Sequence, residues 1–279
     1  MLTALNIEDY TRHGAGRLLS LLRRNRIRVE HRYCDAVAVK SVVYERRRGR
    51  MSWTSVDRFV KDRRGQLLCP PQLELPRDSG FKRFCSHELN RRLCENAALY
   101  LVRELREERP SVVLIDSAGD YAPLCACLLD YTDRVRVITD SPHIYREEAD
   151  RLLEEKGAAL RISTDRKSIS GAGIIIAPER LDEVLGCGDG AVILSGERPA
   201  RSQPTSVICE YTFDLPEKFS SLCPDYLEPM YFASALYTLA GVHELGSSVF
   251  SRCCDGRVLH TRMSLLKLLK ARSDTRAGT

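Results

Sequence analysis

A turn of small residues after a hydrophobic run is the part of the sequence best suited to bind a charged ligand. Residues 112–115 are apolar and mostly β-branched, Asp116 ends the run, and residues 117–119 are serine, alanine and glycine. Apolar residues at helical spacing then begin at Tyr121. This pattern predicts a strand, a tight turn and a helix. At such a turn, unpaired backbone N–H groups and the positive end of the helix dipole can bind a phosphate.

The same alternation of strand, turn and helix continues to about residue 210. Six strands are predicted, at residues 112–116, 134–139, 159–163, 173–177, 191–194 and 206–209. Helices are predicted at residues 121–131 and 144–156, the second ending at Gly157, with another brief helix at 178–186. Strands that alternate with helices at this spacing predict a parallel sheet with right-handed crossovers.

Residues 117–122 resemble the GxGxxG/A fingerprint of the Rossmann-like NAD(P)-binding domain superfamily. Gly119 matches the second glycine and Ala122 the third position, whereas Ser117 replaces the first glycine. Asp140 follows Gly119 by about 21 residues, near where the superfamily places its ribose-binding acid. The resemblance covers residues from about 111 to 210. It implies NAD or NADP as the cofactor and a binding site made of Ser117, Ala118, Gly119, Asp120, Tyr121, Asp140, Ser141 and His143.

The acidic residues of this region have two interpretations each. Asp116 and Asp120 would place negative charge beside the phosphates of a dinucleotide unless they point away. Alternatively, Asp120 stabilises the N-terminus of its own helix, where acids are favoured. Asp140 could bind a ribose, or it could cap the helix that Ser141 and Pro142 begin. The sequence is compatible with both interpretations.

Candidate catalytic and metal-binding groups are sparse. The six histidines show no HExxH or other ligand spacing, and His143 is the one that follows the second strand, near the expected ligand edge. The eleven cysteines contain no CxxC pair, and their odd number favours reduced thiols that act as small hydrophobic residues. We therefore predict no metal and no disulfide, and we assign no catalytic residue.

Basic residues are concentrated in the first third of the chain. They crowd residues 23–28, 46–50 and 61–64, whereas the net charge of the whole chain is only +5. Such a patch can attract an anionic partner, whether nucleic acid, acidic protein or phosphorylated metabolite. The alternative is a solvated surface with arginines at hairpin tips.

The remaining elements suggest a separate α+β domain before residue 109. Its predicted elements are a helix at 5–24, strands at 27–33 and 36–44, a helix at 53–61 capped by Ser52, a loop at 67–78 and a long helix at 86–108. A last helix is predicted at 228–245, ending at Gly246, and the tail after Ala271 is predicted to be disordered.

Together these patterns predict an α/β fold, in which a Rossmann-like doubly wound parallel sheet at residues 109–279 follows a smaller α+β domain at 1–108. No apolar stretch is long enough to cross a membrane and no signal pattern opens the chain, which favours a cytoplasmic protein. The first functional interpretation is a nucleotide-binding protein, an NAD(P)-dependent oxidoreductase. The alternative is a non-enzymatic regulatory or interaction protein with a degenerate Rossmann-like scaffold and a basic N-terminal domain. The sequence indicates neither substrate nor oligomeric state.

Overall fold

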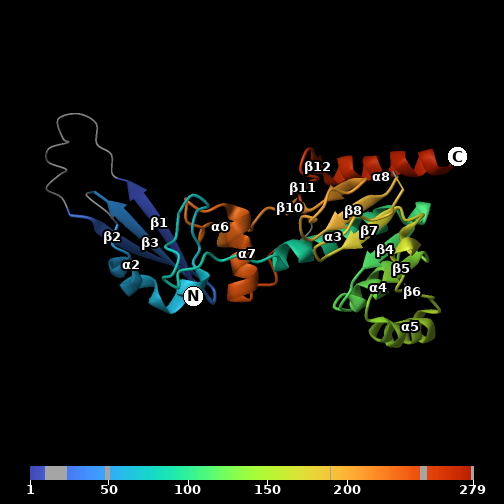
Figure 1. Cartoon of the computed structure of the whole chain (residues 1–279), viewed down its shortest axis with the longest axis horizontal. Helices are drawn as coiled ribbons and strands as arrows, with labels where there is room; N and C mark the ends of the chain where they lie inside the picture. The colour runs from blue at the N-terminus through green and yellow to red at the C-terminus, as the bar shows by residue number, and fades with distance from the viewer. Residues whose placement is uncertain (10–23, 48–50, 189, 246–249, 278–279) are drawn as a thin grey trace. The chain divides into compact units, whose positions relative to one another are not determined.

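The computed structural model describes residues 1–9, 24–47, 51–188, 190–245 and 250–277 (Figure 1). The chain folds into two compact units. Unit 1 contains Met1–Ser86 and Leu215–Gly246, and unit 2 contains His87–Asp214 and Ser247–Thr279. This division differs from the predicted boundary at residue 108, because the long helix belongs to unit 2 and the segment with the last predicted helix returns to unit 1.

Unit 1 is built on a three-stranded sheet of β1 (Leu2–Asp9), β2 (Arg26–Cys34) and β3 (Val37–Arg46), in the order β1-β3-β2. β3 pairs in parallel with β1 and antiparallel with β2. The predicted helix at 5–24 is therefore wrong over residues 5–9, and the rest of it lies almost wholly outside the described residues. Pairing of Leu5 with Val42, both fully buried, overrides the local helical spacing.

Two layers cover the sheet of unit 1. α2 (Trp53–Val60), followed by η1 (Lys61–Gln66), packs Val56 and Val60 against one face. As predicted, α2 begins after Ser52, whose side chain accepts a hydrogen bond from the Ser55 amide. On the other face, the Ser41 hydroxyl lies 2.8 Å from that of Tyr226, in the segment that carries α6 (Glu217–Ser220) and α7 (Pro229–Ala240).

The predicted end of α7 at Gly246 is wrong, because the helix stops earlier. Gly241 has φ +66° and its N–H bonds to the Leu236 carbonyl. A glycine adopts this left-handed conformation without the steric cost of a Cβ, so it ends the helix. The helix predicted at 228–245 is consequently Pro229–Ala240.

Unit 2 contains the predicted parallel sheet. Its six strands are β4 (Val112–Ile115), β5 (Val135–Ile138), β6 (Arg161–Ser163), β7 (Ile174–Ala177), β8 (Val192–Ser195) and β9 (Ser206–Ile208). They lie in the order β6-β5-β4-β7-β8-β9, and every neighbouring pair is parallel. The predicted α/β class and the six strands are confirmed.

The two faces of this sheet are covered differently. α3 (Glu88–Glu104) packs on β7 and β8 and contacts α4 (Ala122–Leu129), which in turn contacts α5 (Pro142–Lys156). The opposite face is covered by η3 (Arg166–Ile169) and by irregular chain, whose Leu181 and Leu185 are buried. The predicted helix at 178–186 is wrong: these residues are described and none is helical.

The remaining elements of unit 2 are a short helix after α3, a small antiparallel sheet and a C-terminal helix. After α3, η2 (Arg106–Glu108) leads to Pro110 and β4. β10 (Glu210–Thr212), β11 (Arg252–Cys254) and β12 (Leu259–Thr261) form an antiparallel sheet, and α8 (Arg262–Ala277) follows. The tail predicted to be disordered is helical to residue 277, anchored by the buried Leu265 and Leu269. Among the described residues, no helix has the length and apolar character needed to cross a membrane.

Candidate functional site

Asp116 organises the turn between β4 and α4. Asp116 is only 1% exposed, and its carboxylate accepts hydrogen bonds from three groups. Oδ1 lies 2.9 Å from the Gly119 amide, whereas Oδ2 lies 2.8 Å from the Tyr121 amide and 2.6 Å from the Tyr145 hydroxyl. The buried carboxylate therefore binds the backbone donors that open α4.

These hydrogen bonds change what the turn can bind. The N–H groups at a helix N-terminus bind an anion when they are unpaired and point toward it. Here the amides of Gly119, in the loop before α4, and of Tyr121, its N-cap, are directed at Asp116, whose charge lies beside the helix N-terminus. The carboxylate thus occupies the role that a phosphate has in a phosphate-binding turn.

Gly119 is required by this turn for two reasons. Its φ is +95°, which strains any residue with a Cβ. A Cβ built at this position would also lie 2.6 Å from Cδ1 of Ile144, in the first turn of α5. The close approach that the glycine permits is therefore made by a side chain of this chain.

Tyr145, the next residue of α5, contacts the turn from the protein interior. The side chain is fully buried, and burial together with the hydrogen bond to Asp116 raises its pKa. Tyr145 therefore stays protonated, and its hydroxyl donates a hydrogen bond to the Asp116 carboxylate. The role of Asp116 and Tyr145 as a pair was not predicted from the sequence, because only the fold brings α5 against the turn.

The other predicted residues of the turn are exposed or half-buried. Ala118 and Asp120 are exposed, and Tyr121 and Ser117 are half-buried. Burial raises the pKa of the Tyr121 hydroxyl to about 12, so this group is not a general base near neutral pH. Asp120 lies in the predicted place at the helix start, but its exposed position fits neither a buried phosphate contact nor a required cap.

The second predicted group lies at the end of β5. The N-cap of α5 is Ser141, with no side-chain cap hydrogen bond, and its amide donates to Thr139 Oγ1 at 3.0 Å. The structure thus gives Asp140 no capping role; its carboxylate lies 3.7 Å from a guanidinium nitrogen of Arg166. His143 is exposed.

Arg166, which the sequence did not single out, links several segments at this edge of the sheet. Besides its contact with Asp140, it donates to Ser117 Oγ at 3.4 Å and forms an ion pair with Glu183. The charge of Arg166 is therefore already balanced by two carboxylates of the protein.

The neighbouring part of the same edge is closed by the first turn of α3. Asn90 donates to the carbonyls of Gly196 and Cys209 at 2.5 and 2.9 Å. Arg91 pairs with Glu197 at 2.5 Å, and its other terminal nitrogen lies 3.8 Å from Glu179. At Gly196 a Cβ would lie 2.1 Å from a backbone oxygen, so this junction leaves no room for a side chain.

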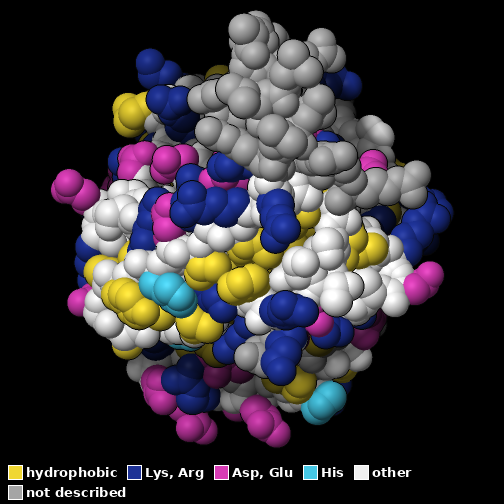
Figure 2. All heavy atoms as spheres, turned by 90° about the vertical axis from the view of Figure 1, so that its left-hand side faces the viewer, with side chains coloured by type: hydrophobic (Ala, Val, Ile, Leu, Met, Phe, Trp, Pro, Cys, Tyr) yellow, Lys and Arg dark blue, Asp and Glu magenta, His cyan; other side chains and the backbone are white. Residues whose placement is uncertain are grey.

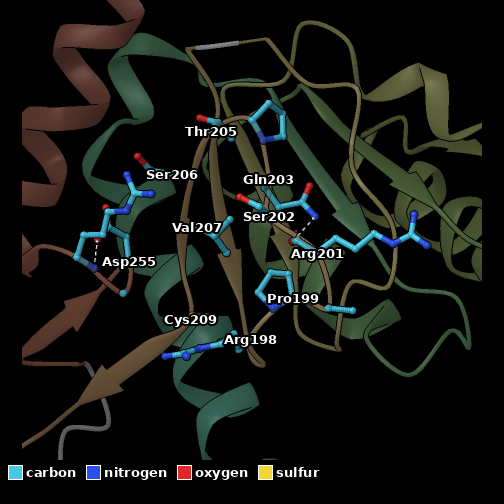
Figure 3. Close-up of a pocket in the computed structure, with 14 residues that line it drawn as sticks. Arg198, Pro199, Arg201, Ser202, Gln203, Thr205, Ser206, Val207, Cys209 and Asp255 are labelled. Carbon is cyan, nitrogen blue, oxygen red and sulfur yellow. Dashed lines mark hydrogen bonds between the residues drawn. The ribbon is translucent and has the colours of Figure 1, made fainter.

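A hollow of about 590 Å³ lies elsewhere in unit 2, at the sheet edge formed by β9 (Figure 3). The loop at residues 198–205 and the turn at 255–257 line it, and none of the predicted site residues does. Figure 3 shows the long side chain of Arg201 running away from Val207 of β9.

Two polar side chains that line this hollow, Gln203 and Asp255, hydrogen-bond to the loops that form it. Gln203 accepts from the Leu185 amide at 2.9 Å and donates to the Glu183 carbonyl at 2.7 Å. Asp255 accepts from two amides of its own turn, including that of Arg257 at 2.9 Å. These contacts explain the loop conformation and indicate no particular ligand.

Among the described residues, the cysteines and histidines do not form a second candidate site. Burial raises the pKa of Cys94 and Cys253 to about 12, so these thiols stay protonated near neutral pH. Within the described ranges, no three His, Cys, Asp or Glu side chains are grouped to hold a metal ion. Comparisons of the chain with models of protein families, with curated proteins and with solved structures find no significant match.

Proposed function

We propose that this chain is a non-enzymatic interaction protein whose unit 2 is a Rossmann-like scaffold without an available phosphate-binding turn. One observation carries the proposal: the carboxylate of Asp116 accepts hydrogen bonds from the Gly119 and Tyr121 amides. In a dinucleotide-binding domain the corresponding region binds the pyrophosphate. In this chain the same donors stabilise the turn itself.

The strand order supports the Rossmann-like part of the proposal. Numbered from β4, the parallel sheet has the order 3-2-1-4-5-6, which is the usual order of dinucleotide-binding folds. The irregular crossovers that replace helices between β7, β8 and β9 depart from that pattern. One face of this scaffold carries irregular chain in place of α-helices, and the amides of its turn already donate to Asp116. Such a scaffold fits a binding role better than catalysis.

The arginines of unit 1 support an interaction role only in part. Arg28 lies 3.2 Å from Glu30 and 3.6 Å from Glu45, and Arg47 lies 2.5 Å from Glu45. Arg46 forms an ion pair with Asp9. Because acids of the same sheet neutralise Arg28, Arg46 and Arg47, these three arginines contribute less to binding an anionic partner than their sequence suggests.

Calorimetric titration of NAD and NADP into the full chain and into Asp120→Asn tests the proposal. We expect no binding heat with either protein, because the amides of the turn are occupied. Asp133→Asn, at an exposed position on the opposite edge of the sheet, is the matched control. Saturable binding of either dinucleotide to the folded wild-type chain would overturn the proposal.

NAD(P) binding is the second candidate function, and one observation favours it. The N-termini of α3, α4 and α5 all lie at the carboxyl edge of the parallel sheet, where open α/β sheets bind ligands. This candidate requires the dinucleotide to displace Asp116 or to bind beside it. It predicts binding to wild type that becomes tighter in Asp120→Asn, because one negative charge near the phosphates is removed.

A further inference from the structure

The sheet of unit 1 extends beyond the helix that covers it. In the β2–β3 register, Val29 pairs with Val42, His31 with Lys40 and Tyr33 with Ala38. The first of these pairs belongs to the core beneath α2. Residues two apart on a strand share a face, so His31 and Tyr33 lie on the same face as Val29 but past the end of the core. Both are exposed, Tyr33 to 70%.

Aromatic rings gather on this part of the face. The rings of His31 and Tyr33 lie with centroids 6.2 Å apart and planes inclined by only 12°. Lys40, opposite His31, donates to the Phe59 carbonyl at 2.7 Å, which brings the last turn of α2 beside the strands. Phe59 is 37% exposed. We call His31, Tyr33, Lys40 and Phe59 the aromatic face.

The charge around the aromatic face is positive. Besides Lys40, the exposed Arg58 and Lys61 flank Phe59 in the chain. The nearby acid Asp35 is paired with Lys218 at 3.3 Å. In the view of Figure 2, hydrophobic side chains lie next to a histidine, with Lys and Arg side chains around them.

We propose that the aromatic face binds single-stranded nucleic acid, with bases stacked on Tyr33 and His31 and phosphates near Lys40, Arg58 and Lys61. Exposed rings of similar orientation on a sheet offer successive stacking surfaces, and any base can use them. Cations beside the rings attract the backbone. The inference names the partner of the proposed interaction protein and rests on that function.

The geometry favours this occupant over other anions. Bases in a duplex are stacked on each other and cannot lie on protein rings, whereas single strands can be splayed onto them. An acidic peptide would use the cations but has no groups that require two neighbouring aromatic rings. The aromatic rings therefore select among anions that the cations alone would not distinguish.

Fluorescence anisotropy with labelled oligo-dT and oligo-U of about 12 nucleotides tests the proposal on the full chain. We expect Tyr33→Ala to weaken binding by about 5- to 150-fold, the range for loss of one base–aromatic stack. Tyr33→Phe should keep near wild-type affinity because the ring remains. Lys61→Gln should weaken binding and reduce its salt dependence. The two oligonucleotides distinguish RNA from DNA as the source of the strand.

Leu259→Ala, at a 58% exposed position in unit 2, is the control for loss of an exposed hydrophobic side chain and should leave binding unchanged. Absence of oligonucleotide binding by the folded chain would overturn the proposal. Equal affinity for polyglutamate or duplex DNA, unaffected by Tyr33→Ala, would also overturn it in favour of a general anion-binding surface. NAD titration is a separate readout, so failure here and failure of the proposed function are distinguishable.

Discussion

The turn after β4 and the aromatic face of unit 1 differ in whether their binding groups already have partners. In the turn, the amides of Gly119 and Tyr121 donate to Asp116, and Ile144 fills the space beside the glycine. On the aromatic face, the rings of His31 and Tyr33 are exposed beyond the end of the core. The turn, which has a familiar sequence pattern, has its binding groups already bonded. The aromatic face, which has no such pattern, has its rings exposed.

This difference shows that residue types at suitable spacing define donors, whereas the fold determines whether those donors are available. An N–H group that points at a buried carboxylate contributes to stability and not to ligand binding. An exposed ring contributes almost nothing to stability but keeps its full surface for a partner. Substitutions in the turn should therefore change stability, and substitutions on the aromatic face should change binding.

The largest expected effect on stability comes from Asp116→Ala. The change leaves three donors without their acceptor inside the protein, and we expect the free energy of unfolding to fall by about 3 kcal/mol or more. Urea unfolding followed by circular dichroism measures it. Tyr33→Ala, on the aromatic face, should change the same quantity by less than about 0.5 kcal/mol. Similar losses in the two variants would contradict the comparison.

Gly119→Ala should destabilise the chain by about 1–3 kcal/mol, because the left-handed backbone and the contact with Ile144 both oppose a Cβ. Ile144→Ala removes the contact but not the backbone strain. In the Ile144→Ala background, Gly119→Ala should therefore cost less than it does in wild type. An unchanged cost in this double-mutant cycle would mean that Ile144 does not restrict the turn.

Alkaline pH should weaken the closed turn through Tyr145. Its pKa is raised in the folded chain by burial and by Asp116, whereas in the unfolded chain it titrates near the usual value of about 10. Above that pH the unfolded chain releases the proton and the folded chain keeps it, so stability falls as pH rises. Between about pH 10 and 11, wild type should lose about 1 kcal/mol more than Tyr145→Phe. Parallel pH profiles of unfolding would contradict this role.

The smallest expected effect is that of Asp120→Asn on stability. Asp120 is exposed in the first turn before α4, where a carboxylate interacts with the helix dipole by only a few tenths of a kcal/mol. Thermal unfolding at low and high salt measures this contribution, which salt should screen. A loss above about 1 kcal/mol would show that Asp120, and not Asp116 alone, supports the turn.

Much of unit 2 was predictable because its signals are local. The six apolar runs, the N-cap Ser52 in unit 1 and the helix end at Gly157 each depend on a few neighbouring residues. Two of the errors came from distant partners. β1 forms because β3 pairs with it, and the segment at 215–246 belongs to unit 1 because it covers the second face of that sheet.

The candidate site followed the same rule. The sequence located the turn and its glycine, but it left the orientation of Asp120 open and did not indicate that Asp116 accepts hydrogen bonds from the turn's amides. That role depends on the sharp backbone path at Gly119 and on Tyr145, which lies 29 residues farther along the chain. The aromatic face was also missed, because only folding pairs Lys40 with His31 and brings the last turn of α2 to Lys40.

Amide hydrogen exchange at Gly119 and Tyr121 is the most direct test of the account. If Asp116 holds these two N–H groups, both should exchange slowly in the folded chain without any ligand, and NAD or NADP should not change their rates. Asp116→Ala, under conditions where it remains folded, should accelerate both. Rapid exchange in the wild-type chain that slows when NAD is added would contradict the account and would assign these amides to a dinucleotide.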